Sequence, residues 1–360
     1  MQLHLVGGFL GSGKTTAIIE AAKWLASKGM RVGVVTNDQG KYLVDTAFMR
    51  LSDLPTVEVT GGCFCCRYDD LDERLHQLID SSQPDVIFAE SVGSCTDIVA
   101  TVVKPLLSLG SGDIQPASFS VFVDGRLFLR WTEGQPLPFS EDVVYIFEKQ
   151  IEEAGLLVVN KSDLLKPDER QRLESWLNTH HQGRPFRFQN SLDPDSVKGW
   201  MRMVQDEPSL LRDESFELDY ERYSRGEVQM AWLDGEVNLT DITKPGREVL
   251  VGWLEILLES LETHQVGIGH LKFIFQCGYR STKLSFTGAG QDGWQAQVPD
   301  EACDTWQVLV NARAEARAET LRDLFLQALD QAQAVYGFSI EIANLEHFHP
   351  EKPMPTHRIN

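Results

Sequence analysis

Over the first 200 residues, short apolar runs alternate with segments of helical spacing. Leu156–Val159 is apolar at every position, as expected of a strand covered on both faces. The segments 70–79 and 169–177 repeat apolar side chains every three or four residues, which indicates amphipathic helices. This alternation predicts an α/β fold with a doubly wound, mainly parallel sheet. The predicted strands are 3–7, 31–36, 57–59, 85–89, 119–124, 156–160 and 186–189, and the predicted helices begin near Lys14, Asp70, Asp97, Ser140 and Pro167.

The pattern changes after residue 205. Acidic side chains without periodicity crowd 206–226, which predicts a linker, and the following segment predicts a smaller α+β domain with helices on one face of a mainly antiparallel sheet. Its expected strands are 228–239, 270–276, 282–287, 305–311 and 339–342, and its expected helices are 247–264 and 314–336. The prolines of the final stretch exclude a helix or a central strand. We therefore expect four parts: 1–205, 206–226, 227–345 and a tail at 346–360.

Composition and charge narrow the classes of partner. The 360 residues are 42% apolar and 24% charged, an ordinary globular mixture, with a formal net charge of −20. Such a surface repels phosphate backbones and anionic lipid, so we expect neither nucleic acid nor membrane as a partner. The sequence has no apolar run of 18 residues and no signal-peptide pattern at its start, which predicts a cytoplasmic protein.

A glycine-rich loop near the start has the spacing of a phosphate-binding loop. Gly8-x4-Gly13-Lys14-Thr15 follows an apolar strand and opens a predicted helix, the context that this motif requires. The glycines allow backbone N–H groups to point at a phosphate, while the lysine reaches the β- and γ-phosphates and Thr15 is placed to ligate Mg²⁺. The expected nucleotide-binding residues of the loop are Gly8, Gly11, Ser12, Gly13, Lys14, Thr15 and Thr16.

Two further segments indicate which nucleotide binds and how it reacts. Asn160-Lys161-x-Asp163 ends an apolar strand, and an aspartate there can accept two hydrogen bonds from guanine, which adenine cannot donate; we therefore expect GTP. Asn190-Ser191 is a weaker candidate for a base-contacting loop. Glu90-x-x-Gly93 also ends a strand, so we expect Glu90 to organise the attacking water, as a catalytic residue beside Lys14, and Gly93 to contact the γ-phosphate.

A cysteine cluster suggests metal binding. Cys63, Cys65 and Cys66 are packed into four positions, and a turn there can aim their sulfurs at one point, which we expect to be exposed. Thiolates suit Zn²⁺, and three of them also suit Cu(I) or thiol redox chemistry. The other cysteines are Cys95, Cys277 and Cys303. They are scattered along the chain, and we expect them to be small buried hydrophobic residues rather than disulfide partners.

Together these motifs resemble the CobW-type branch of the P-loop GTPase family that includes HypB and UreG. The resemblance rests on the phosphate loop, Glu90-x-x-Gly93, Asn160–Asp163, Gly62–Cys66 and the stretch Gln150–Lys161, and it covers most of residues 1–200. The second domain resembles the CobW C-terminal domain only in size and element order. The resemblance implies a slow GTPase that serves as a metal chaperone or insertase in zinc- or cobalt-linked pathways, including cobalamin.

The loop after the second predicted strand departs from that family. Asn37–Gly40 is the expected nucleotide-sensing switch, with Asp38 or Asp45 as Mg²⁺-shell groups. Family members commonly carry a glutamate just after its glycine, where this chain has Lys41. A lysine offers no oxygen ligand, so the fourth metal ligand stays unassigned.

The sequence therefore predicts a GTPase that uses Mg²⁺ and passes zinc or another transition metal to a client protein. One alternative is a regulatory GTPase with a structural zinc site that assists loading of a corrinoid or another metal cofactor; another is a nucleotide-dependent kinase, against which Asn160–Asp163 counts. His347, His349 and His357 form a secondary metal candidate, although a solvated tail or a tail docked on the other domain is favoured. The client and the oligomeric state stay open, a homodimer being one possibility.

Overall fold

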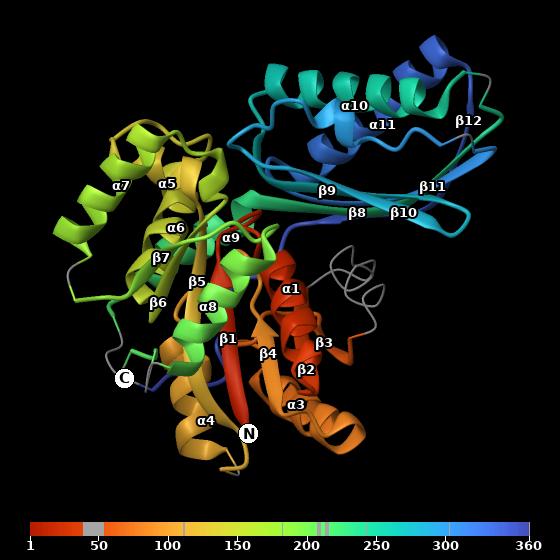
Figure 1. Ribbon diagram of the computed structural model, residues 1–360. Helices are drawn as coiled ribbons and strands as arrows, with labels where there is room; N and C mark the ends of the chain where they lie inside the picture. The colour runs from red at the N-terminus through yellow and green to blue at the C-terminus, as the bar shows by residue number, and fades with distance from the viewer. Residues whose placement is uncertain are drawn as a thin grey trace. The chain divides into compact units, whose positions relative to one another are not determined.

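The computed structural model describes most of the chain in two compact units (Figure 1). Among the described residues, unit 1 holds 1–38, 54–227 and 351–359, and unit 2 holds 228–350. Several residues of the predicted switch loop lie outside the described part: the Mg²⁺-shell candidates Asp45 and the side chain of Asp38, together with Gln39, Gly40 and Lys41. The described ranges are 1–38, 54–110, 112–181, 183–206, 210–212, 216–242, 244–301 and 303–359.

Unit 1 is built on a parallel sheet of seven strands within the described residues. The strand order is β3-β2-β4-β1-β5-β6-β7, and each neighbouring pair is parallel. This confirms the predicted doubly wound α/β fold and places β1 centrally, between β4 and β5. Because the strands are parallel, the loops at their carboxyl ends lie along one edge, where such folds bind ligands. The strands are β1 (Gln2–Gly8), β2 (Val32–Asp38), β3 (Thr56–Thr60), β4 (Val86–Glu90), β5 (Gln115–Asp124), β6 (Leu156–Asn160) and β7 (Phe186–Phe188).

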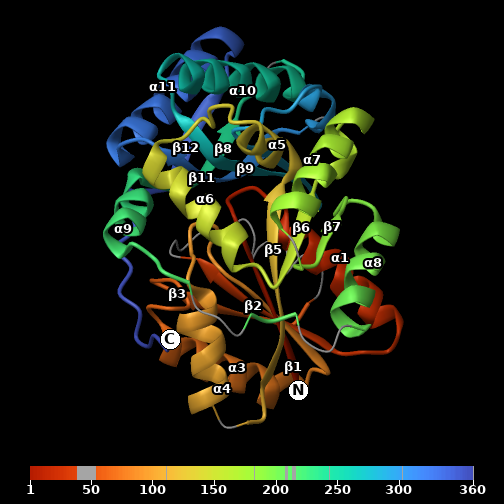
Figure 2. The same cartoon turned by 90° about the vertical axis from the view of Figure 1, so that its left-hand side faces the viewer.

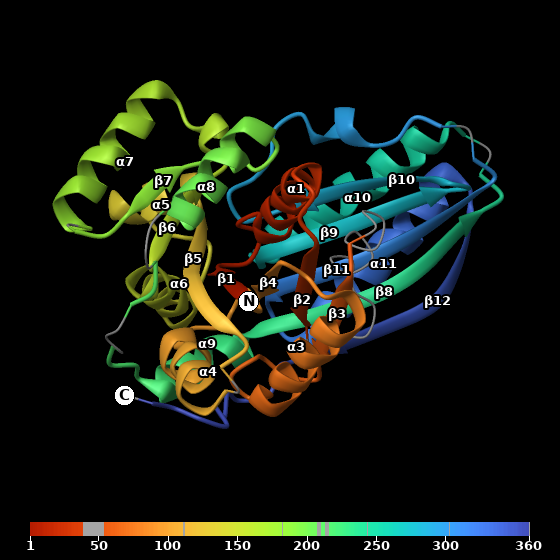
Figure 3. The same cartoon turned by 60° about the horizontal axis from the view of Figure 1, so that its bottom comes forward.

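Helices cover both faces of this sheet. Helices α1 and α8 share one face, and α3, α4 and α6 lie on the other (Figure 3). The buried Trp200 of α8 packs among Ile18 of α1, Phe88 of β4 and Phe122 of β5, so strand side chains are buried as their continuous apolar runs predict. The helices are α1 (Lys14–Ser27), α3 (Tyr68–Ser82), the π-helix η1 (Val99–Val103), α4 (Lys104–Leu109), α5 (Gly125–Thr132), α6 (Glu141–Glu153), the 3₁₀ turn η2 (Ser162–Leu164), α7 (Pro167–His180), α8 (Pro194–Asp206) and α9 (Tyr220–Gln229).

Two segments of unit 1 differ from the sequence prediction. The expected helix near Asp97 begins only at Val99, because Asp97 has a positive φ of 66°. The expected linker contains the helix α9, whose first turn is capped: the Asp219 carboxylate accepts N–H bonds from Glu221 and Arg222, both at 3.0 Å. This cap, which supplies partners for otherwise unpaired N–H groups, explains why an acidic segment without clear periodicity is helical.

Unit 2 contains an antiparallel sheet of five strands within the described residues, in the order β10-β9-β11-β8-β12. Helices α10 and α11 pack together on one face (Figure 2), burying Trp253, Phe273 and Phe325 between them and the sheet. The elements are β8 (Met230–Thr240), α10 (Gly246–Thr263), β9 (Gly267–Cys277), β10 (Arg280–Phe286), the 3₁₀ turn η3 (Trp294–Gln297), β11 (Thr305–Glu315), α11 (Ala318–Tyr336) and β12 (Ser339–Phe348). No helix in the described ranges combines the length and apolarity needed to cross a membrane.

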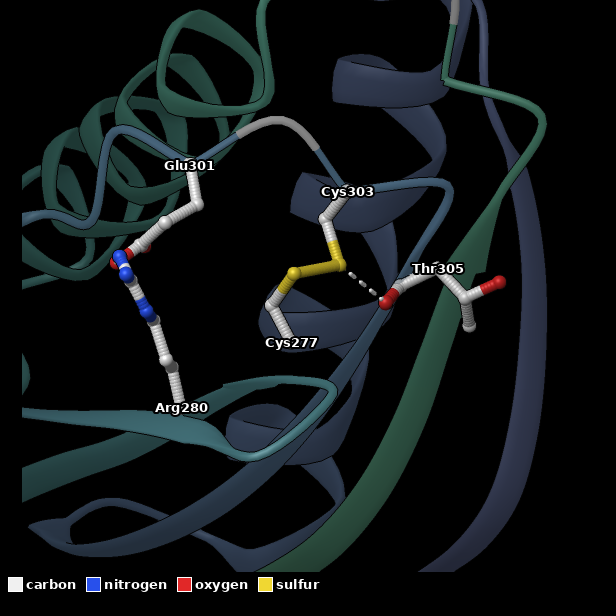
Figure 4. The surroundings of a disulfide bond; sticks show 5 residues. All are labelled: Cys277, Arg280, Glu301, Cys303 and Thr305. Atoms are coloured by element: carbon white, nitrogen blue, oxygen red, sulfur yellow. Dashed lines mark hydrogen bonds and ion pairs between the residues drawn. A yellow bond between two sulfur atoms is a disulfide. The ribbon is translucent and has the colours of Figure 1, made fainter.

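The expectation for two of the scattered cysteines is wrong. Cys277 and Cys303, which are 26 positions apart, form a disulfide in unit 2 (Figure 4). Cys277 ends β9 and Cys303 lies just before β11, and these strands are antiparallel neighbours. The pairing depends on this strand order, so the separation of the two cysteines in sequence gave no sign of it.

Candidate functional site

The phosphate loop joins β1 to α1 and has the backbone that its glycines allow. Gly8, Gly11 and Gly13 all have positive φ, at 121°, 70° and 90°. A Cβ on Gly8 would stand 2.1 Å from the Phe122 carbonyl oxygen, and one on Gly13 would stand 2.4 Å from the Asn160 side-chain nitrogen. Glycine is thus required here both for conformation and for space.

The side chains predicted to act on the phosphates are buried at this loop. Lys14 Nζ donates to the Gly8 carbonyl oxygen at 2.6 Å, so its ammonium group is folded over the loop. Thr15 Oγ1 donates to Glu90 Oε1 at 2.8 Å, which brings together two groups predicted from segments 75 residues apart. The buried Ser12 hydroxyl has no hydrogen-bond partner within the described residues. A loop with a cation, a threonine–carboxylate pair and an unused hydroxyl fits a Mg²⁺-bound nucleoside triphosphate.

Asn160 braces the phosphate loop. Its Nδ2 donates to the Ser12 carbonyl oxygen at 2.7 Å, and its Oδ1 accepts from the N–H and hydroxyl of Ser191 at 3.1 and 2.8 Å. Asn160 therefore joins the loop after β6 to the phosphate loop and to the loop after β7. The sequence grouped Asn160 with the nucleotide contacts, whereas its contacts in the structure are with the protein itself.

Lys161 and Asp163 differ in their surroundings. Lys161 has a positive φ of 56°, and its Nζ bonds the buried Asp124 carboxylate at 2.9 Å. Burial alone would raise the pKa of Asp124, but Lys161 and Arg126 outweigh it and hold that pKa below its usual range. Asp163 is exposed in η2. The Lys161 side chain is thus held by its ion pair with the buried Asp124. The Asp163 side chain is exposed, so a nucleobase can reach it.

The loop from Glu90 to Asp97 lies against the phosphate loop. Gly93 leaves no room for a side chain, because a Cβ would meet Leu10 Cα at 3.0 Å and Leu10 Cδ2 at 2.6 Å. Gln150 of α6 donates to the carbonyl oxygens of Gly93 and Cys95 at 3.0 and 2.8 Å. The loop is therefore fixed by α6 on one side and in contact with the phosphate loop on the other.

The cysteine turn, residues 62–66, follows β3 and is held by Asn37 at the end of β2. Asn37 Nδ2 donates to the carbonyl oxygens of Val59 and Gly62 at 3.1 and 2.7 Å, and its Oδ1 accepts from the Phe64 N–H at 2.8 Å. Phe64 is fully buried, and the turn is not exposed as the sequence predicted. Asn37, the first residue of the predicted nucleotide-sensing switch, therefore connects that segment to the cysteine turn.

The sulfurs of the cysteine turn converge. The Sγ–Sγ distances are 2.8 Å for Cys63–Cys65, 3.1 Å for Cys63–Cys66 and 3.8 Å for Cys65–Cys66. Hydrogen bonding with Cys65 and Cys66 lowers the pKa of Cys63 well below its usual value. The same contact with Cys63 raises the pKa of Cys66 to about 12. The three thiols of the turn thus hold their protons unequally.

These three residues fit a transition metal. Two sulfurs bound at ~2.3 Å in a tetrahedral site are about 3.8 Å apart, the distance that Cys65 and Cys66 already have. The other two pairs are closer and would have to open by about 1.0 and 0.7 Å to reach that distance. Soft thiolates select zinc or Cu(I) over magnesium or calcium. Within the described part of the chain, the group of side chains identified as able to hold a metal ion is Cys63, Cys65 and Cys66.

The end of the chain returns to unit 1 and covers the cysteine turn. The Met354 N–H donates to Cys66 Sγ at 3.1 Å, and the Thr356 N–H donates to the Cys65 carbonyl oxygen at 2.9 Å. The His357 ring meets Tyr68 edge-on with centroids 5.0 Å apart, and Arg358 pairs with Asp97 at 2.8 Å. We call residues 353–359 the tail segment; its docking explains why Cys66 is only half-exposed.

The three histidines considered as a secondary metal site are not a single cluster. His349 Nε2 accepts the Ala318 N–H at 3.1 Å, and His347 contacts Arg322 at 3.3 Å, both in unit 2. His357 belongs to the tail segment in unit 1. The two histidines of unit 2 thus have structural partners at the start of α11.

Two functional candidates escaped the sequence analysis. Cys95 is a free cysteine that is 2% exposed, and it contributes to the lowered pKa of Cys63. Glu227 of α9 is buried and accepts from Ser94 Oγ at 2.6 Å; burial and the charge of Cys63 raise its pKa well above the usual value. Both lie far in sequence from the cysteine turn, so only the fold brings them near it.

The first half of the chain is similar to known proteins. The CobW/HypB/UreG nucleotide-binding domain matches residues 2–188. The chain is 30% identical over 184 residues to the zinc chaperone YeiR of Escherichia coli, and 28% identical over 182 residues to the zinc chaperone CobW of a Sinorhizobium species. These alignments cover 49% and 45% of this chain, and 51% of each relative.

A third relative is matched over most of its length. The urease accessory protein UreG of Metallosphaera sedula is 29% identical over 221 residues, which are 57% of this chain and 93% of that protein. The chain thus spans about half the length of the two zinc chaperones and nearly all of UreG. Because the family match covers more than half of the chain and includes the phosphate loop, Glu90, the cysteine turn and Asn160, the chain belongs to the CobW/HypB/UreG family.

Proposed function

We propose that the protein is a GTP-hydrolysing metallochaperone or insertase, which couples hydrolysis to the transfer of a transition metal of the zinc or cobalt class to a client protein. The convergence of three cysteine sulfurs, all within 4.8 Å of one another, carries this proposal. They lie in the same unit as the phosphate loop. Asn37, the first residue of the predicted switch, is hydrogen-bonded to their turn. The relatives named zinc chaperones support zinc as the first metal to test.

Hydrolysis requires a water to attack the γ-phosphorus while charge develops on the phosphate oxygens. In our proposal Lys14 leaves the Gly8 carbonyl and binds those oxygens, and the N–H groups of the phosphate loop bind the β-phosphate. Thr15 is the residue to hold Mg²⁺, which would neutralise phosphate charge when bound. Glu90, hydrogen-bonded to Thr15 in the structure, orients the water, and Gly93 approaches the γ-phosphate.

Guanine selection is assigned to the loop after β6. Asp163 is exposed and can accept both guanine donors, and the fixed stem of Lys161 can cover the base. The client is a metalloprotein that we do not identify. We place the reaction in the cytoplasm, and a homodimer is compatible with the proposal.

The second candidate is a regulatory GTPase with a structural zinc, which assists loading of a corrinoid or another metal cofactor into a partner enzyme. The burial of Cys63 and Cys65, which are 2% and 1% exposed, favours it, because structural zinc sites are closed whereas transfer sites keep an accessible position. Cys66 is the more exposed ligand and favours transfer instead.

Zinc release during turnover separates the two candidates. The full chain is loaded with zinc and mixed with GTP, and a chromophoric chelator reports free zinc while phosphate release is followed. The chaperone proposal predicts that release follows hydrolysis, and that Glu90→Gln slows both by at least about tenfold without a matching loss of GTP affinity. Asp168→Ala, at an exposed position of α7, is the control.

Two other outcomes would each reject part of the proposal. Zinc that stays bound through many turnovers rejects the chaperone proposal in favour of the structural site. Zinc bound at unchanged stoichiometry by a variant with serine at positions 63, 65 and 66 rejects the cysteine turn as the site.

A further inference from the structure

The tail segment binds the cysteine turn in the way that an added strand binds a sheet edge. The N–H groups of Met354 and Thr356, two positions apart, donate to Cys66 Sγ at 3.1 Å and to the Cys65 carbonyl oxygen at 2.9 Å. The Thr356 hydroxyl also donates to the Cys66 carbonyl oxygen, at 3.2 Å. In an extended chain, the N–H groups of alternate residues point to the same side. The turn therefore holds the tail segment largely through its backbone.

A buried carboxylate holds the far end of the tail segment. Asp97 is 1% exposed, and its Oδ2 accepts from Arg358 Nε at 2.8 Å and from the Tyr220 hydroxyl. Its Oδ1 has no hydrogen-bond partner within the described residues. One position further along the tail segment, the Ile359 N–H donates to the Ala100 carbonyl oxygen at 2.9 Å. Because a buried carboxylate that loses its cation is strongly destabilising, this position requires a positively charged side chain.

The surface beneath the tail segment offers acceptors, and the tail segment supplies the donors. In each bond described above between the two, unit 1 accepts through a sulfur, a backbone carbonyl or the Asp97 carboxylate. Apart from the Thr356 hydroxyl, Arg358 is the side chain among these donors. The formal net charge of −20 further attracts basic segments. The surface thus fits an extended peptide with a basic residue at the position of Arg358, whichever chain supplies it.

On the basis of the proposed function, we propose that this surface is the docking site of the client, and that the tail segment occupies it until the client binds. The client presents an extended segment with a basic side chain. That side chain replaces Arg358 at Asp97, and the backbone of the segment replaces Met354 at Cys66. Displacement of the tail segment uncovers Cys66, the most exposed of the three cysteines of the turn.

The same contacts give the nucleotide a means to loosen the tail segment. Asp97 ends the loop that begins at Glu90, and Glu90 accepts the Thr15 hydroxyl of the phosphate loop at 2.8 Å. Asp97 has a φ of 66°, in the left-handed region that side chains disfavour, so the surrounding contacts must hold it there. A γ-phosphate that moves Glu90 or Gly93 would therefore shift Asp97 and weaken its hold on Arg358.

A fluorescent peptide with the sequence of the tail segment tests the docking site. In the full chain, Arg358→Glu places a second negative charge beside Asp97 and should release the chain's own tail segment. The peptide should bind this variant at least about tenfold more tightly than it binds the unmodified chain, whose tail segment competes at high local concentration. Arg172→Glu is the control, because it makes the same charge reversal at an arginine paired on the surface with Glu133 and Asp168. Fluorescence anisotropy measures the affinities.

Two further measurements fix where the peptide binds. The same peptide carrying Arg358→Glu should not bind, and bound tail peptide should slow the alkylation of Cys66. Equal affinity of the tail peptide for the Arg358→Glu chain and the unmodified chain, or no binding to either, overturns the proposal. If the Arg358→Glu chain does not fold, a chain that ends after Lys352 takes its place, with the same expected result.

A model client separates this inference from the proposed function. A zinc-finger peptide with two cysteine and two histidine ligands is joined to the tail sequence, with or without Arg358→Glu, and mixed with the zinc-loaded full chain and GTP. Zinc passes between the two ligand sets as Zn²⁺, so no oxidant or reductant is needed. The fusion with arginine should take up zinc at least about tenfold faster, because docking raises its concentration at the cysteine turn. Equal rates overturn the docking site and leave the proposed function intact. Zinc that stays on the chain in both mixtures overturns the proposed function, while the peptide affinities still decide the docking site.

Discussion

The phosphate loop and the cysteine turn each follow a strand of one parallel sheet, but they are built differently. The phosphate loop follows β1 and is made largely of backbone, which three glycines with positive φ allow to curl. The cysteine turn follows β3 and is completed by groups from distant segments: the side-chain amide of Asn37 and the backbone N–H of Met354. The first is a contiguous motif, whereas the second exists only in the folded chain. We therefore expect changes at the two regions to have separable effects, joined through the Glu90–Asp97 loop.

The largest expected effect is at the phosphate loop. Lys14→Ala removes the ammonium group that we assign to the phosphates, and GTP affinity should fall by at least about 100-fold, or about 2.7 kcal/mol. Zinc affinity without nucleotide should stay within twofold, because Lys14 bonds the Gly8 carbonyl and not the cysteine turn. Titration calorimetry measures both. Lys23→Ala, on the same helix and paired only at the surface with Glu20, is the control; equal GTP affinity of the two variants would contradict the assignment.

The free energy of unfolding should depend on pH through Glu153. Glu153 is buried beneath the segment that follows Cys95, accepting the Val99 N–H at 2.6 Å, and burial raises its pKa to about 8. Between the ordinary carboxyl pKa near 4.5 and about 8, the folded state holds a proton that the unfolded chain has lost. This group therefore lowers the free energy of unfolding as pH rises through that window, by up to about 1.4 kcal/mol per pH unit.

Glu153→Gln removes that titration and keeps an acceptor for Val99. Urea unfolding at pH 5 and pH 8 should show the variant gaining stability relative to the unmodified chain as pH rises. Glu152→Gln, a partly exposed neighbour paired with Lys149, is the control. A difference between Glu153→Gln and the unmodified chain that is the same at both pH values would show that Glu153 is not held protonated.

A smaller effect is expected at the support of the cysteine turn. Asn37→Ala removes two hydrogen bonds to that turn and one to Val59 of β3, and such loss of support around metal ligands typically lowers affinity by 10- to 100-fold. We expect about a tenfold weaker zinc affinity, measured by competition with a chelator. Thr56→Val, on the adjacent strand and bonded only to its own loop at Leu54, should change little. If both variants bind zinc equally, Asn37 does not hold the turn in its binding geometry.

The smallest effect concerns the tail segment. Ending the chain after Lys352 removes the Met354 N–H bond to Cys66 and the cover over Cys65. Alkylation of Cys66, followed by mass spectrometry, should become several-fold faster, since access and the shielding of its sulfur both change. Arg358→Ala, which removes the pair with Asp97 but leaves the Met354 and Thr356 backbone bonds to the turn, should accelerate it less. An unchanged rate in the shortened chain would mean that the tail segment does not protect Cys66.

The difference between the two regions also explains what the sequence could predict. The phosphate loop, the strand-ending Glu90 and the loop after β6 are short patterns, and their parallel-sheet context was visible in the alternation of apolar runs. Glu90 and Thr15 were named separately, and the structure pairs them. The use of Asn160 as a brace was not visible, because a motif gives a residue's position and not its partner.

The metal site was only half predictable. Three cysteines in four positions signal a cluster, but the groups that hold and cover it come from distant segments. Asn37 lies 25 positions before Gly62, and Met354 lies 288 positions after Cys66. In unit 2 the Cys277–Cys303 bond depends likewise on two strands being neighbours. Helix α9 was missed because its stability comes from an aspartate cap and from packing of Tyr223, not from a strong apolar period.

Coupling between the two regions is the central claim, and zinc affinity in different nucleotide states tests it most directly. The dissociation constant of zinc is measured by chelator competition on the full chain without nucleotide, with GDP, and with a non-hydrolysable GTP analogue. Because linkage is reciprocal, a γ-phosphate that moves the Glu90–Asp97 loop must change zinc affinity, and typical couplings are about 5- to 150-fold. We predict a difference of at least about fivefold between the GTP-analogue and GDP states. Equal zinc affinity in all three states would contradict the coupling.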